Sequence, residues 1–251
     1  MSLRSLGIIP ARYASSRFPG KPLVMIGAKS MIMRVYEQAY KSAALNKVIV
    51  ATDDERIYNH VRNCGGEVMM TSEKHVSGTS RIGEVVDKLT ASENEHFDVI
   101  VNIQGDEPFI DPSQIDLVVS LFLRQDVQIG TLIRKISDND DVSNPNVVKV
   151  VVDHTGKALY FSRSPIPFLR EVPRDSWFSH HEYFRHIGLY AFRSEVLNAI
   201  VRLPASGCEM AESLEQLRWL HHGYSIYTAL TEIETIGIDA PEDLLKLTNN
   251  A

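Results

Sequence analysis

The segment I-I-P-A-R-Y-A-S-S-R-F-P-G-K-P spans residues 8–22 and contains three cations, Arg12, Arg17 and Lys21. Arginine offers forked donors that match phosphate oxygens, and lysine offers a mobile point charge. The prolines restrict the backbone, which lowers the ordering cost when a ligand binds. A predicted strand over 6–9 runs directly into the loop that contains these cations, and α/β proteins bind ligands at that end of the sheet. The pattern favours a loop that holds a polyanion, with an ordinary basic surface loop as the alternative.

Acidic residues follow another predicted strand, in N-I-Q-G-D-E-P over residues 102–108. Gly105 permits a close approach of backbone to ligand. Asp106 would lie beside the phosphate loop, where Mg²⁺ typically bridges a protein carboxylate and substrate phosphates. A solvated turn at the strand end explains the same residues equally well. Asp239, in I-G-I-D-A-P-E-D, has the context of a helix N-cap, which can also present an oxygen to a metal.

The segment H-V-S-G-T-S-R, residues 75–81, places small residues before a helix whose first turn contains Arg81. Backbone N–H groups and hydroxyls there could bind a base or a ribose. A Ser/Thr helix cap is an equally good explanation.

Two further sets of polar residues lie in the second half of the chain. Arg163 could hold a substrate carboxylate as a bidentate pair, whereas a histidine at a strand start, such as His186, is more often structural. Glu212, Glu215 and Gln216 lie near one face of a predicted helix, and such groups suit sugar hydroxyls. A solvated helix face is the ordinary explanation of that pattern.

Composition narrows the classes of function. The 251 residues suffice for one large α/β domain or two small ones, and the net charge of −6 argues against a general nucleic-acid binder. Local cations in an acidic chain indicate a small anionic ligand. Cys64 and Cys208 have no metal-site spacing and form no disulfide framework, which fits a reducing cytoplasm. We expect no signal peptide and no membrane insertion.

Strands and helices alternate in the first half of the chain. The predicted elements are strands over 6–9, 47–52, 67–70 and 97–103 and helices over 31–44, over 55–63, around 82–89 and around 115–122. Repeated βαβ units of this kind predict a mainly parallel sheet with helices on both faces.

The second half has a different pattern. It predicts a hairpin of strands 147–152 and 158–162, a loop over 169–182, a strand over 186–192, a helix over 211–221 and a final helix after Asp239. No interdomain linker is evident. We expect one α/β domain over 1–251, with a mainly parallel mixed sheet and a smaller antiparallel subregion.

Taken in order, the motifs resemble those of the 3-deoxy-manno-octulosonate cytidylyltransferases, also called CMP-KDO synthetases. The matching segments cover nearly the whole chain and are I-I-P-A-R-Y-A-S-S-R-F-P-G-K-P-L, V-A-T-D-D, H-V-S-G-T-S-R, V-N-I-Q-G-D-E-P, N-P-N-V-V-K-V-V, A-L-Y-F-S-R-S-P-I-P, R-H-I-G-L-Y-A-F-R, E-S-L-E-Q-L-R and G-I-D-A-P-E-D-L. The chain departs from the family's S-G-T-E-R at Ser80, and 169–182 matches no pattern. Sugar-1-phosphate nucleotidyltransferases normally carry G-x-G before the arginine, where this chain has Pro10-Ala11.

The resemblance implies a nucleotide-diphospho-sugar transferase fold, a cytoplasmic homodimer, and CMP transfer from CTP to KDO with Mg²⁺, for lipopolysaccharide biosynthesis. By position, the triphosphate residues are Arg12, Arg17 and Lys21, of which Arg12 and Lys21, with Asp106, are the predicted catalytic residues. The nucleotide side adds Ser77, Gly78, Thr79, Arg81 and Gln104. The sugar side comprises Gln104, Arg163, His186, Tyr190, Glu212 and Gln216, and the metal ligands are Asp106 and Asp239.

Two alternatives remain at this point. One is a cytidylyltransferase for another acidic or amino-substituted 2-keto sugar, in which only the sugar side would differ. The other is a non-catalytic nucleotide-binding regulator of the same fold, which the presence of both candidate metal carboxylates disfavours.

Overall fold

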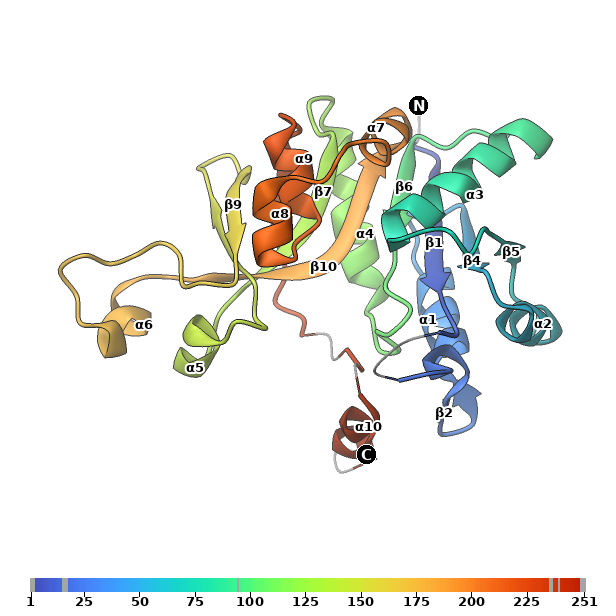
Figure 1. Ribbon diagram of the computed structural model, residues 1–251, viewed down its shortest axis with the longest axis horizontal. Helices are drawn as coiled ribbons and strands as arrows, with labels where there is room; N and C mark the ends of the chain where they lie inside the picture. The colour runs from blue at the N-terminus through green and yellow to red at the C-terminus, as the bar shows by residue number, and fades with distance from the viewer. Residues whose placement is uncertain (1–2, 15–17, 94, 235–236, 239, 249–251) are drawn as a thin grey trace.

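The computed structural model describes residues 3–14, 18–93, 95–234, 237–238 and 240–248, and its centre is a nine-stranded sheet (Figure 1). Seven strands follow the order β11-β7-β10-β6-β1-β4-β5, while β8 pairs with β10 and β9 pairs with β8. The sheet combines strands from both halves of the chain.

The first half forms the parallel part of the sheet, as the sequence predicts. β1 (Ser5–Ala11), β4 (Lys47–Thr52), β5 (Val68–Met70) and β6 (Val99–Asn102) all run in one direction. These strands are runs of apolar residues that are buried on both faces, which is typical of parallel sheets under helices. Their carboxyl ends therefore meet at one edge of the sheet.

The second half adds strands of mixed direction. β10 (Phe184–Arg193) is antiparallel to both β6 and β7 (Ile129–Lys135), and β11 (Ile226–Leu230) is parallel to β7. The predicted hairpin is confirmed as the antiparallel pair β8 (Lys149–Val152) and β9 (Ala158–Ser162). The sequence prediction did not include β7 or β11.

Helices pack on both faces of the sheet and enclose two apolar cores. α3 (Gly78–Glu93), α7 (Ser194–Ile200) and α9 (Gln216–His221) contribute to one core, and α1 (Met31–Tyr40), α2 (Glu55–Asn63) and α4 (Pro112–Ser120) contribute to the other. Asp54 caps α2 and Asp111 caps α4, each by accepting a backbone N–H two residues on. The predicted bounds of α2 are confirmed, whereas α1 ends at Tyr40 instead of residue 44.

The single helix predicted over 211–221 is wrong, because two helices occupy this part of the chain. α8 (Gly207–Glu212) begins earlier, at a capping box between Ser206 and Glu209. Ser213 then adopts a left-handed conformation with φ of 52° and ends α8, and α9 begins at Gln216. The leucines that predicted this helix, Leu214, Leu217 and Leu220, all follow Ser213, so their periodicity did not reveal the break before them.

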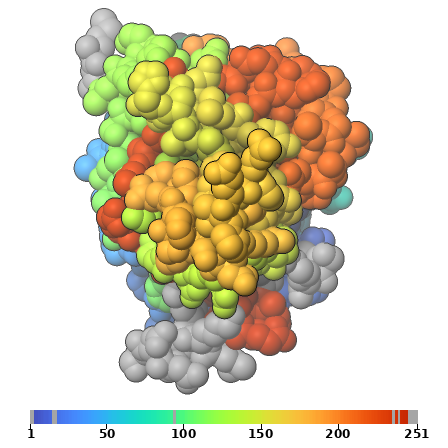
Figure 2. Space-filling view, turned by 90° about the vertical axis from the view of Figure 1, so that its left-hand side faces the viewer, coloured from blue at the N-terminus to red at the C-terminus, as the bar shows by residue number. Residues whose placement is uncertain are grey.

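A projecting arm, defined here as residues 136–183, extends from the sheet. It contains α5 (Asn139–Ser143), the β8–β9 hairpin and α6 (Trp177–His180), the last within the stretch predicted as a loop. A small third core of Ile136, Val142, Val147, Trp177 and Tyr183 supports it. Figure 1 shows α6 at its far end, and Figure 2 looks onto this side of the molecule.

The remaining elements are short or terminal. β2 (Met25–Ile26) and β3 (Lys29–Ser30) form a separate hairpin, and α10 (Pro241–Thr248) confirms the final helix. The helices of the described part of the chain are too short or too polar to cross a membrane.

Candidate active site

A small cavity lies at the carboxyl ends of β1 and β6. Its volume is about 160 Å³. It is lined by Pro10, Ala11, Arg12, Lys21, Pro22, Gln104, Gly105 and Asp106. The structure thus brings the basic loop and the acidic strand end together, as the sequence predicts from the parallel order of the strands.

Gly105 allows the two strand ends to approach each other closely. A Cβ atom at this position would lie 2.9 Å from the carbonyl oxygen of Pro10, a contact that real side chains essentially never make. Gly20 has a second specific role, because its φ of 73° begins the short helical turn Lys21–Leu23. These two glycines place Lys21 over the end of β6.

Lys21 and Asp106 meet at the centre of the cavity. The Nζ atom of Lys21 lies 2.8 Å from Oδ2 of Asp106 and donates to the carbonyl oxygen of Ile238 at 2.7 Å. The backbone N–H of Ile238 donates in turn to the carbonyl oxygen of Asp106 at 2.9 Å. The chain just before Asp239 therefore lies against Asp106, although Asp239 itself lies outside the described residues.

The oxygen atoms around Lys21 Nζ are of the type that Mg²⁺ requires. A carboxylate oxygen and a carbonyl oxygen already converge within 2.8 Å of one positive charge. Among the described residues, no three His, Cys, Asp or Glu side chains gather into a metal-binding group. A metal here would take few protein ligands, which suits an ion that also binds substrate phosphates.

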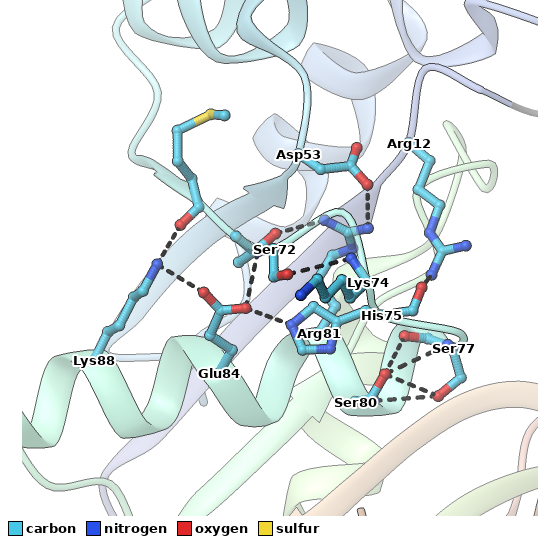
Figure 3. A network of polar contacts seen from close by, with 12 residues as sticks. Arg12, Asp53, Ser72, Lys74, His75, Ser77, Ser80, Arg81, Glu84 and Lys88 are labelled. Atoms are coloured by element: carbon cyan, nitrogen blue, oxygen red, sulfur yellow. Dashed lines mark hydrogen bonds and ion pairs between the residues drawn. The ribbon is translucent and has the colours of Figure 1, made fainter.

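Arg12 lies at the edge of the same cavity, beside Asp53 and Arg81 (Figure 3). One of its Nη atoms donates to the backbone carbonyl oxygen of His75. Burial lowers the pKa of the Arg12 guanidinium, the nearby charge of Arg81 lowers it further, and Asp53 partly opposes this. An anion bound at Arg12 would relieve this repulsion between like charges.

Glu107 is a titratable group to which the sequence prediction gave no role. Burial, together with the charge of Asp106, raises the pKa of Glu107 to about 7. Neutralisation of Asp106 by a bound cation would weaken the second of these effects. Ionisation of Glu107 is thus coupled to what occupies the cavity.

The predicted nucleotide segment packs beside the cavity at the start of α3. A Cβ atom on Gly78 would lie 3.3 Å from Cγ of Pro10, so this backbone approaches the end of β1. The hydroxyls of Ser77 and Ser80 hydrogen-bond within the first helical turn, as the cap explanation requires. Thr79 donates from Oγ1 to Oε2 of Glu215 at 2.6 Å, which joins this segment to the helix region of the predicted sugar side.

Arg81 has no exposed surface. Its Nη atoms donate to the Thr71 hydroxyl and to the Asp53 carboxylate, each at 2.5 Å. This pairing fixes the start of α3 against the ends of β4 and β5. Its assignment to nucleotide binding stays a prediction.

The predicted sugar-side residues of β10 lie on the other side of Gln104. The amide nitrogen of Gln104 donates to the carbonyl oxygen of Gly188 at 3.1 Å. Tyr190 is buried, and its hydroxyl has no hydrogen-bond partner among the described residues. Its ring packs 5.1 Å from His186, whose Nε2 lies 3.0 Å from the Thr131 hydroxyl. Burial lowers the pKa of His186 to about 3, so this imidazole is neutral at pH 7.

Arg163 and Glu212 hydrogen-bond to each other and stabilise the end of β9. The guanidinium of Arg163 donates to the carbonyl oxygens of Glu212 at 2.6 Å, Pro145 at 2.9 Å and Ser213 at 3.4 Å. The Glu212 carboxylate accepts from the Ser162 hydroxyl at 2.7 Å and the Arg163 backbone N–H at 2.8 Å. These contacts fix the turn between α8 and α9, and a direct role of either residue toward a sugar stays a prediction.

The remaining predicted positions complete the comparison. Gln216 is buried at the start of α9. Arg17 lies outside the described residues, as Asp239 does. The sequence prediction missed the contributions of Asp53 and of the His75 carbonyl. The adjacent acids at the end of strand 47–52 could have indicated Asp53, but a backbone carbonyl such as that of His75 leaves no signal in a sequence.

Comparisons with known proteins agree on one group of enzymes. A family model described as cytidylyltransferase matches residues 6–232. A protein of Cytophaga hutchinsonii named 3-deoxy-manno-octulosonate cytidylyltransferase is 51% identical over 98% of this chain and 97% of its own length. A protein of the same name from Parabacteroides distasonis is 52% identical over 97% of this chain and 96% of its own.

Solved structures give the same result. A CMP:2-keto-3-deoxy-manno-octonic acid synthetase complexed with CTP superposes with a TM-score of 0.89 at 40% identity, over 98% of each chain. A 4-diphosphocytidyl-2C-methyl-D-erythritol synthase superposes with a TM-score of 0.64 at 12% identity over 97% of each chain, which is a likeness of fold alone.

Proposed function

The chain belongs to the cytidylyltransferase family, together with the 3-deoxy-manno-octulosonate cytidylyltransferases, and on that premise we propose that it transfers CMP from CTP to the anomeric hydroxyl of KDO, with release of pyrophosphate. The observation that carries the proposal is the meeting of Arg12, Lys21 and Asp106 in one cavity at the carboxyl ends of β1 and β6. Cations for a triphosphate and a carboxylate for its metal are the groups that this nucleotidyl transfer needs.

In the proposed reaction, the C2 hydroxyl of KDO attacks the α-phosphorus of CTP in line, and the bond to the β-phosphate oxygen breaks. Arg12 and Lys21, with Arg17, would bind the phosphates and stabilise the negative charge that develops on the departing pyrophosphate. Positioning and electrostatics supply the rate, and no side chain is assigned as a general base.

Asp106 and the predicted ligand Asp239 would hold Mg²⁺. When bound, the ion would supply positive charge at the α-phosphate and at the attacking oxygen. Lys21 pairs with Asp106 in the described structure, and it would turn toward the phosphates once Asp106 binds a metal. The carboxylate and carbonyl oxygen atoms that converge on Lys21 Nζ support a magnesium site here.

For the two substrates, the cavity and its surroundings divide into a nucleotide side and a sugar side. Ser77, Gly78, Thr79 and Arg81 are proposed for the nucleotide, and His186, Tyr190, Arg163, Glu212 and Gln216 for KDO. Gln104 lies between the two groups, because it lines the cavity and also donates to the backbone of β10. The Tyr190 hydroxyl, buried without a partner among the described residues, supports a ligand contact on this side.

The whole chain, residues 1–251, is proposed as a single cytidylyltransferase domain of the cytoplasm that serves lipopolysaccharide biosynthesis. One sheet built from both halves of the chain supports the single domain. A homodimer is also proposed. The exposed apolar side chains of Leu159, Tyr160 and Phe168 on the projecting arm support an association surface there.

The proposal is tested by pyrophosphate release with four nucleotides, each combined with several 2-keto acid sugars. We expect turnover with CTP and KDO and with no other pair at comparable efficiency. If a modified KDO is the preferred substrate, the proposed reaction stands and only the identity of the sugar changes. Failure to release pyrophosphate with every pair, despite nucleotide binding, would favour the regulator instead.

A further inference from the structure

The loop of residues 71–77 connects β5 to α3 and provides the backbone carbonyl on which Arg12 rests. Arg12 crosses from the end of β1 to donate to the carbonyl oxygen of His75 (Figure 3). Among the described residues, no other hydrogen bond restrains this guanidinium. The orientation of Arg12 at the cavity thus depends on where the loop places a single carbonyl group.

One carboxylate, that of Glu84 on α3, holds this loop at two points. Oε2 of Glu84 accepts the backbone N–H of Ser72 at 2.9 Å, and the same oxygen contacts Nε2 of the His75 imidazole. The Ser72 hydroxyl accepts the backbone N–H of Lys74 at 3.2 Å between these points. The loop is therefore fixed at its entry and at the residue whose carbonyl meets Arg12.

Glu84 is itself held in place from the other side. Its Oε1 lies 2.7 Å from Nζ of Lys88, which also donates to the carbonyl oxygen of Met70 at 2.7 Å. Burial opposes ionisation, but hydrogen bonds from Lys88, the Ser72 N–H and His75 lower the pKa of Glu84 to about 2. The carboxylate is ionised at neutral pH, and its side chain is only 22% exposed. A half-buried, multiply bonded anion is a firm anchor for a loop.

We propose that Glu84 is a positioning residue for nucleotide binding, which fixes the His75 carbonyl and through it the orientation of Arg12 at the phosphate cavity. This inference rests on the proposed function, because it assumes that Arg12 binds a nucleotide phosphate. A free arginine side chain carries about 2 kcal/mol of rotamer entropy. Ordering the guanidinium before the ligand arrives reduces what binding must overcome.

The test uses CTP binding by calorimetry in the presence of MgCl₂, with steady-state kinetics for both substrates. Glu84→Ala removes the carboxylate that anchors the loop, and His75→Ala, made independently, removes the imidazole that contacts this carboxylate. Because removal of a hydrogen bond to a charged group weakens an interaction by about tenfold, each variant should bind CTP about tenfold more weakly. The KM for KDO should change less than about twofold, since no contact in the network reaches β10.

Glu73→Gln is the matched control, because Glu73 is an exposed acid in the same loop and takes no part in the contacts described around Glu84. It should bind CTP like the wild type, within about twofold. Circular dichroism and thermal melting establish that each variant is folded. If Glu84→Ala does not fold, His75→Ala provides the same measurement without altering α3.

A double-mutant cycle with Arg12→Ala separates positioning from a general effect on structure. If Glu84 acts through Arg12, Glu84→Ala should weaken CTP binding by less than about twofold in the Arg12→Ala background. An undiminished loss in that background, or no loss in the wild-type background, would overturn the inference. A wild-type protein that binds no CTP would instead contradict the proposed function.

Discussion

The ammonium nitrogen of Lys21 lies 2.8 Å from Oδ2 of Asp106, although 85 residues separate the two in the sequence. One residue was predicted to bind phosphates and the other to bind a metal, so their direct contact joins two roles in one cavity. Each side chain neutralises the other in the structure described here. Removal of either one should therefore affect both substrate binding and the charge balance of the site.

Asp106→Asn should reduce kcat by at least about 100-fold, because an amide cannot supply the anionic oxygen that a magnesium ion prefers. The fold should persist, since the two side chains have the same shape and the backbone bond from Ile238 is retained. Pyrophosphate release and a thermal melt measure the two effects. Asp87→Asn, the same change at an exposed position of α3, should leave both unchanged. Full activity of Asp106→Asn would remove this residue from the metal site.

Lys21→Met should reduce kcat/KM by roughly 30- to 1000-fold, because loss of a charge-assisted contact to developing charge costs about 2–4 kcal/mol. Arg17→Ala should have an effect of similar size. Steady-state kinetics with CTP as the varied substrate measure the loss. Lys29→Met, at an exposed lysine of β3, is the control. If both site variants have wild-type kinetics, the loop is an ordinary basic surface loop with no role in phosphate binding.

Arg163→Ala should raise the KM for KDO more than the KM for CTP. The guanidinium bonds to two backbone carbonyls at the α8–α9 turn and to that of Pro145 in the projecting arm, so its loss should loosen the sugar side and lower the melting temperature. Arg163→Lys should restore little, because a single ammonium cannot replace the planar fork. Separate titrations of KDO and CTP measure the two KM values. A loss confined to CTP would place Arg163 outside the sugar pocket.

Glu107 should make stability depend on pH in a defined window. Its pKa is about 7 in the folded protein against 4.5 for an ordinary glutamate, so the folded state binds more protons than the unfolded state between these values. Stability contributed by Glu107 therefore falls as pH rises from about 4.5 to about 7, by at most about 3 kcal/mol.

Glu107→Gln removes this titration. Without metal, the free energy of unfolding of the variant should rise relative to wild type across the same pH window. Urea denaturation at several pH values measures the difference between the two proteins. Parallel curves would show that Glu107 ionises near its ordinary pKa in the folded state.

Much of the candidate site was determined by the sequence alone. Because strand ends in a parallel sheet share one edge, the sequence predicted that Asp106 would lie beside the phosphate loop, but it did not predict the direct ion pair of Asp106 with Lys21. The bounds of strand 47–52 and helix 55–63 also followed, because buried runs, an Asp cap and a terminating glycine are local signals. Family membership followed from the order of motifs along the whole chain.

Other features required the tertiary structure, because they depend on partners distant in sequence. Ser213 ends α8 just before the leucines from which a single helix was predicted, and the break is stabilised by Arg163, 50 residues away. The contact of Arg12 with the His75 carbonyl joins a side chain to a backbone group, which any residue type could supply. Glu84 lies on a helix where a solvated acid is the ordinary expectation, and only packing of the 71–77 loop against α3 turns it into an anchor. Local patterns are encoded residue by residue, whereas these pairings exist only once the sheet has set the distances between segments.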